Sequence, residues 1–115
     1  MTQTTTKSLI VFPGNLVVGA GQAAEYWLVS NTTGAAATTV DLVFALKNEY
    51  DQIPAIMGTP LLTPGASSTT TKIVAWYVKT QSKTSITVTV EVDQVAGAGQ
   101  DNTITMAAYI AGPQA

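Results

Sequence analysis

The chain has 115 residues, of which 10% are charged, and its formal net charge at pH 7 is -2. It contains neither Cys nor His, which excludes disulfides, thiolate nucleophiles, the common zinc sites and histidine general bases. All basic residues are lysines, so no arginine fork is available for phosphate or guanine, and we expect no nucleic-acid partner.

The N-terminal segment predicts how the chain begins and where it is not targeted. Residues 1–6 are rich in Thr and predict a flexible arm before a single domain at residues 7–115. A first strand is expected at residues 7–12, where the apolar run is too short for a signal peptide core or a membrane span. We therefore expect no membrane partner and no export by the general secretory route. Without that route, the glycosylation acceptor pattern at Asn31-Thr32-Thr33 is a weak signal.

Most of the remaining chain alternates apolar and polar residues with the period of two that is typical of a half-buried strand. The clearest case is the segment 85–92, where branched apolar residues alternate with Ser, Thr and Glu. Residues 47–58 interrupt this pattern and predict a long connection, with a short helical turn or an edge strand near residues 53–57. Further strands are expected at residues 23–30, 38–46, 67–78 and 102–110.

About seven short strands without a sustained helical period predict an all-β fold. The expected architecture is an immunoglobulin-like antiparallel β-sandwich, with a jelly roll as the alternative. The segment 85–92 is expected to be a central strand of this sandwich, with one face in the core and the other toward solvent or a packing partner.

Three segments have turn and strand patterns in common with a known family: an Asn31-to-Gly34 turn before a strand (30–40), a Pro-Gly turn before a Ser/Thr-rich strand (62–65), and a strand-Asp-loop-Asn-strand ending (90–93 followed by 101–103). Together they resemble the cell-adhesion-related immunoglobulin-fold modules of bacteria and archaea, which are called CARDB-like. The sequence departs from that pattern in its Asn31-Thr32-Thr33-Gly34 turn and in the insertion at residues 47–58. The resemblance implies a binding or structural module of a surface assembly and brings no active site with it.

Five carboxylates are the candidates for chemistry. Glu91, Asp93 and Asp101 flank the last loop and have the oxygen ligands that Ca²⁺ prefers, but the spacing of a calcium-binding loop is missing. We expect turn and strand-capping roles for Asp93 and Asp101 instead. Glu49 and Asp51 are expected in a solvated loop rather than as an acid/base pair. We assign no catalytic residue, no metal site and no cofactor.

Two pairs of adjacent aromatic residues, Tyr26–Trp27 and Trp76–Tyr77, lie on predicted strands. Neighbouring strand residues point to opposite faces, so one member of each pair is expected in the core and the other on an outer face or rim. An exposed aromatic side chain beside a Thr-rich surface is a candidate contact for a protein partner. The alternative is that these side chains only cover the ends of the sandwich.

The predicted outer faces hold mostly Thr, Ser, Ala and Tyr, whereas soluble monomers usually carry more surface charge. Edge strands without Lys or Pro invite pairing with another chain, and the arm at residues 1–6 is a candidate strand for a neighbour. These features favour a non-catalytic structural protein of a virion, such as a capsid decoration protein, that binds copies of itself and a larger assembly. The alternative is an extracellular or cell-surface module of an adhesin, surface layer or filament; no nucleophile and base pattern supports an enzyme.

Overall fold

The computed structural model describes residues 6–12, 21–32, 39–63, 65, 72–93 and 102–115. Seven strands run through them, and no helix occurs in this part of the chain. The predicted all-β antiparallel sandwich of about seven strands is confirmed. The strands are β1 (Thr6–Phe12), β2 (Gln22–Thr32), β3 (Thr39–Ala45), β4 (Ala55–Thr63), β5 (Ile73–Gln81), β6 (Ser85–Val92) and β7 (Thr103–Pro113).

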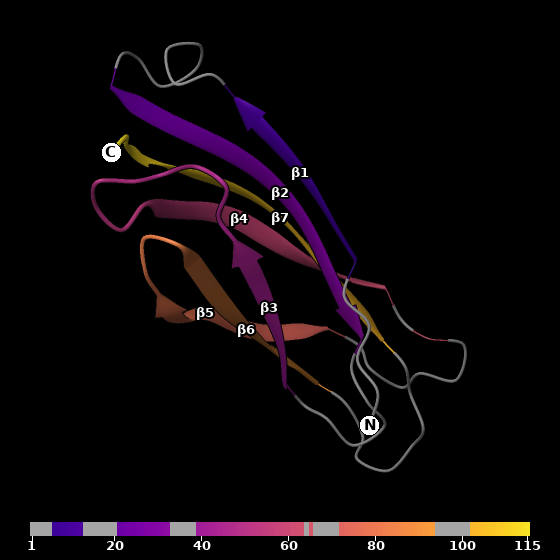
Figure 1. Cartoon of the computed structure of the whole chain (residues 1–115). Coiled ribbons are helices and arrows are strands. Elements are labelled where there is room, and N and C mark those ends of the chain that lie inside the picture. Colours follow the sequence, from indigo (N-terminus) through magenta and orange to yellow (C-terminus); the bar gives the residue numbers. More distant parts are fainter. Residues whose placement is uncertain (1–5, 13–20, 33–38, 64, 66–71, 94–101) are drawn as a thin grey trace.

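The strands form a four-stranded sheet in the order β1-β2-β7-β4 and a three-stranded sheet in the order β3-β6-β5, which lie as two layers (Figure 1). In an immunoglobulin constant domain, the fifth strand lies beside the second and the seventh beside the sixth. Here these two strands exchange sheets, so that β7 pairs with β2 and β5 pairs with β6. The resulting nested pairing, β2 with β7 and β3 with β6, is that of the jelly-roll alternative, although a complete jelly roll has eight strands.

The largest difference from the predicted elements lies in the expected connection at residues 47–58. Of the two alternatives expected near residues 53–57, the edge strand is confirmed as β4, but this strand has nine residues and extends well beyond the expected stretch, to Thr63. Gly58 and Pro60 hide this strand in the sequence because both residues are disfavoured in strand interiors. The fifth strand also lies later than predicted, at Ile73–Gln81, and residues 66–71 lie outside the described part of the chain.

The edge strands β4 and β5 carry features that oppose pairing with another chain, in contrast to the expectation of unguarded edges. Pro60 in β4 has no N–H to donate to a further strand. In β5, the register shifts between Ile73 and Ala75 and again between Val78 and Thr80, where Lys79 is also placed. Bulges, Pro and Lys are devices that block edge-to-edge association.

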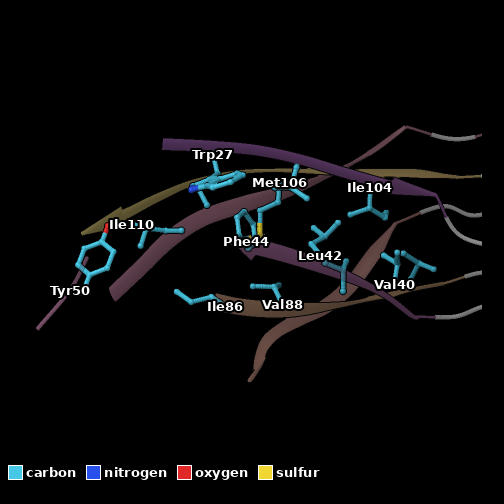
Figure 2. Packing of buried hydrophobic residues seen from close by; sticks show 14 of the residues in the cluster. Trp27, Val40, Leu42, Phe44, Tyr50, Ile86, Val88, Ile104, Met106 and Ile110 are labelled. Atoms are coloured by element: carbon cyan, nitrogen blue, oxygen red, sulfur yellow. The ribbon is translucent and has the colours of Figure 1, made fainter. Parts of the chain in front are cut away.

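The core forms because the apolar rows of the two sheets face one another (Figure 2). Trp27 of the four-stranded sheet meets Phe44 of the three-stranded sheet edge to face, with ring centroids 6.4 Å apart at 90°. Each large apolar side chain buried in this way contributes roughly 1.5–3 kcal/mol. The largest fully buried apolar side chains are Trp27, Val29, Val40, Leu42, Phe44, Ile86, Val88, Ile104, Met106 and Ile110.

One glycine sets how closely β4 approaches β7. A Cβ atom at Gly58 would lie 3.0 Å from the Cα of Ala108 and would overlap the carbonyl oxygen of Ala107. Only glycine permits this approach of two backbones. The neighbours of Gly58, Met57 and Thr59, thereby stay in register with β7 and lie on the outer face of the sheet.

Candidate functional site

The outer face of the four-stranded sheet lacks charge in three of its four strands. Glu25 is the only charged residue in β2, β4 and β7, and its side chain is fully buried. The outward positions of these strands alternate with the core residues, and their registers place them in rows across the sheet. We call this surface, formed by the outward residues of β2, β7 and β4, the uncharged face.

Large apolar side chains are prominent on the uncharged face. Met57 and Leu61 are each 66% exposed, and Leu28 is 39% exposed. Met57 pairs across the sheet with Tyr109, which in turn pairs with Tyr26, so that one bulky row crosses three strands. The next row is smaller and consists of Leu28, Ala107 and Thr59.

The outer face of the three-stranded sheet has a different chemistry, since it carries charged residues in all three strands. Asp41 of β3 accepts a hydrogen bond from the Thr89 hydroxyl (2.8 Å) and pairs with the Lys79 ammonium (3.1 Å). The hydrogen bond from Thr89, together with Lys79, lowers the pKa of Asp41 below its ordinary value, although desolvation opposes the shift. Thr89 itself is buried beneath this pair. The half-buried Glu91 of β6 adds a further charge to the face.

A polar cluster lies inside the sandwich at the end of the core, around the carboxylate of Glu25. One carboxylate oxygen accepts hydrogen bonds from the Trp27 indole N–H (2.7 Å) and the Lys47 backbone N–H (2.9 Å). The other accepts hydrogen bonds from the Asn48 backbone N–H (3.1 Å) and the Tyr50 hydroxyl (2.7 Å). Four donors thus satisfy a buried charge that has no basic side chain among these partners.

This cluster holds the connection between β3 and β4 against β2. The Asn48 side-chain amide adds a hydrogen bond to the carbonyl oxygen of Ala24 (3.0 Å), and burial raises the pKa of the Tyr50 hydroxyl well above its ordinary value. Tyr50 also forms a β-bridge with Gln114. Because its donors and acceptors are occupied by one another, the cluster positions a loop rather than presenting a reactive group to a ligand.

The three carboxylates considered for a calcium site are not seen together. Glu91 is half-buried on the outer face of β6, while Asp93 is exposed and its backbone N–H donates to the carbonyl oxygen of Lys72 (3.1 Å). Asp101 lies outside the described residues. Within the described part of the chain, no three acidic residues lie close enough to one another to hold a metal ion.

The structure also places the Glu49 and Asp51 carboxylates and the Asn31 glycosylation pattern. Glu49 and Asp51 are exposed, and their backbones bond the C-terminal segment: Asp51 N–H donates to the Pro113 carbonyl (2.9 Å) and Ala115 N–H to the Glu49 carbonyl (3.0 Å). The amide of Asn31, the residue of the glycosylation pattern, is buried and donates to the Asp41 carbonyl oxygen (2.9 Å). In the folded chain this amide is therefore shielded from modification.

Of the two aromatic pairs, Tyr26–Trp27 divides between the core and the outer face as predicted, whereas both members of Trp76–Tyr77 are exposed, so the prediction of a core member is wrong for that pair. Trp27 is buried in the core and Tyr26 is half-buried on the uncharged face. On β5, Trp76 is in register with the core residue Val90 but remains 37% exposed, because β5 lies at the edge of its sheet. Tyr77 is in register with Thr89 on the outer face and is 49% exposed.

Sequence reasoning missed Glu25 and the exposed residues of β4. Glu25 had a signal, since it is in phase with Trp27 and Val29 on the core face of its strand. No sequence signal marked Met57 and Leu61 as surface residues of a sheet, because the region of their strand was predicted mainly as a connection. The structure adds that none of the described residues forms a helix long and apolar enough to span a membrane.

Comparisons with models of known protein families, with curated proteins and with solved structures find no match for this chain. The resemblance to CARDB-like modules therefore stays a prediction. Any inference about function has to come from the surfaces of the molecule itself.

Proposed function

We propose that this protein is a non-catalytic structural subunit of a larger protein assembly, such as a virus particle, to which it binds through the uncharged face. The observation that carries this proposal is the exposure of Met57, Leu61 and Leu28 on a sheet face without a charged side chain in β2, β4 or β7. Exposed apolar patches of this kind mark sites of protein contact.

Charge depletion is the second support. The centres of protein interfaces are depleted in charged residues and enriched in Tyr and Met, and the bulky row of Tyr26, Tyr109 and Met57 has this composition. The outer face of the three-stranded sheet carries charge instead, since Asp41, Lys79 and Glu91 lie there. Both outer faces expose apolar side chains, Val43 and Tyr77 on the three-stranded sheet among them, but only the uncharged face combines this exposure with an absence of charge in β2, β4 and β7.

Two of the four edge strands, β4 and β5, are guarded, which favours a face contact over strand addition at those two edges. Pro60 and the two register shifts of β5 oppose the addition of a strand at these edges. A face contact needs no such edge, because side chains rather than backbone groups make it.

The test is to follow the protein in extracts and particle preparations of its source on a density gradient, with an antibody against the chain. We expect it to sediment with particles far larger than its own mass of 11.9 kDa. A tagged Met57→Glu variant, expressed beside the natural protein, is expected to stay at the top of the gradient. Finding the natural protein only as a free small species would contradict the proposal.

A further inference from the structure

We propose that the occupant of the uncharged face is a second copy of the chain, packed sheet against sheet about a two-fold axis. This inference rests on the proposed function, because it names the partner of the same surface. A two-fold axis sets a surface against itself, so the surface has to be complementary to its own copy.

The absence of charge removes the main electrostatic obstacle to contact between two copies of the face. Charged groups at an interface select a partner by matching opposite signs, and like charges opposed to one another are costly. The uncharged face has no charged side chain in β2, β4 or β7, so it opposes its own copy without repulsion. The outer face of the three-stranded sheet, with Asp41 and Glu91, would set like charges near each other in a similar contact.

The surface relief is also compatible with self-packing. A two-fold axis that lies between the sheets and runs across the strands reverses the order of the rows in the second copy. The bulky row of Tyr26, Tyr109 and Met57 then lies over the smaller row of Leu28, Ala107 and Thr59 from the second copy. Packed sheets interdigitate in this way at a separation of about 10 Å.

The area of the uncharged face lies at the lower limit of what a weak dimer needs. Three strands about 4.8 Å apart and about 35 Å long present roughly 500 Å² per copy, or about 1,000 Å² in total. Stable protein interfaces bury about 1,200–2,000 Å². A dimer that dissociates on dilution is therefore the expected state of the isolated chain.

The experiment is light scattering coupled to size-exclusion chromatography on the purified full chain, over about 1 μM to 1 mM. The mass is expected to rise with concentration from 11.9 kDa to twice that value. Met57→Glu and, separately, Leu61→Glu place a charge on the face of each copy, so we expect the dissociation constant to rise at least about 100-fold.

The matched control is Val74→Glu, which introduces the same charge on the edge strand β5, at a side chain that is 61% exposed compared with 66% for Met57. Its dissociation constant is expected to stay within about twofold of the natural value. Circular dichroism and thermal unfolding establish that each variant is folded, since all three positions are exposed at edge strands.

Two outcomes would overturn the second-copy proposal. The first is a natural protein that stays at 11.9 kDa over the whole concentration range. The second is a dimer that Met57→Glu and Leu61→Glu leave unchanged. A chain that is monomeric in solution but sediments with large particles in a Met57-dependent manner would contradict the second-copy proposal alone, whereas a chain that is free in both experiments would contradict both proposals.

Discussion

The two sheets place their hydrogen-bonded carboxylates on opposite sides. The four-stranded sheet holds Glu25 on its inner face and leaves the outer positions of β2, β7 and β4 without charge. The three-stranded sheet has a wholly apolar inner row in β3 and β6 and holds Asp41 outside, beside Lys79. Both carboxylates accept hydroxyl hydrogen bonds, from Tyr50 and Thr89 respectively.

Burial, more than the number of charged partners, decides how much a carboxylate contributes to the free energy of unfolding. A buried polar group that loses its partners costs its full desolvation free energy, whereas an exposed ion pair is largely replaced by water. The buried position of Glu25 also leaves the outward residues of β2, β7 and β4 without charge, which is the feature on which the proposed function rests.

The largest expected effect is that of removing the carboxylate of Glu25. Glu25→Ala leaves four donors without their acceptor, two of them backbone N–H groups, and we expect the free energy of unfolding to fall by about 3–5 kcal/mol. Urea unfolding measures this loss of stability. Glu25→Gln keeps one acceptor oxygen, so its free energy of unfolding is expected to lie between those of the natural protein and Glu25→Ala. Glu91→Ala on the opposite outer face is the control, with a change of about 0.5 kcal/mol; equal effects at Glu25 and Glu91 would break the comparison.

Removing one donor of the same cluster tests it at a finer scale. We expect Tyr50→Phe to lower the free energy of unfolding at neutral pH by about 1–2 kcal/mol. Burial raises the pKa of Tyr50 in the folded chain, so the stability that its neutral form contributes is lost as pH rises beyond about 10, the ordinary tyrosine value. The difference between natural protein and variant should therefore shrink in strongly alkaline urea titrations, and a difference that stays constant there would contradict the role assigned to Tyr50.

On the outer face of the three-stranded sheet the expected effect is smaller. Asp41→Asn should lower the free energy of unfolding at pH 7 by about 0.5–1 kcal/mol. The pKa of Asp41 is lowered in the folded chain, so its contribution is present above the ordinary carboxyl pKa of about 3.9 and is lost as pH falls below it. Carboxyl-carbon NMR titration gives the pKa directly; Thr89→Val should raise it more than Lys79→Ala, and the reverse order would contradict the assigned cause.

The smallest expected effect belongs to the exposed ion pair. The side chains of Lys79 and Asp41 are 55% and 40% exposed. Lys79→Ala should therefore lower the free energy of unfolding by only about 0.3 kcal/mol. The difference should vanish in about 1 M NaCl, which screens exposed charges. Lys83→Ala in the exposed turn before β6 is the control, and a loss at Lys79 that persists in high salt would show that more than an ion pair is involved.

Local patterns in the sequence were sufficient to predict the faces of most strands. The alternation at residues 85–92 correctly places Ile86, Val88, Val90 and Val92 inward and makes β6 the centre of its sheet. The same reasoning separates Trp27 from Tyr26. It does not predict which strand lies beside which, because a period of two reports the environment of a strand and not its neighbour.

The candidate surface and the buried cluster depend on contacts that are distant in the sequence. The donors from Lys47, Asn48 and Tyr50 reach Glu25 across 22, 23 and 25 positions, and two of them are backbone groups that no side-chain pattern reveals. Met57 belongs to the uncharged face because Gly58 allows β4 to approach β7 closely. In the sequence, Gly58 is only a residue that disfavours a strand, so this close approach could not be predicted.

The nested strand order has a consequence for how the chain acquires its structure. β7, one of the two inner strands of the four-stranded sheet, is the last of the seven strands in chain order, and its partner β2 is the second. The entropy of closing such a long loop is lost before β2 and β7 can form hydrogen bonds, so this topology folds slowly compared with local hairpins. Until β7 has been synthesised, β4 has no partner in its sheet and β2 can pair only with β1.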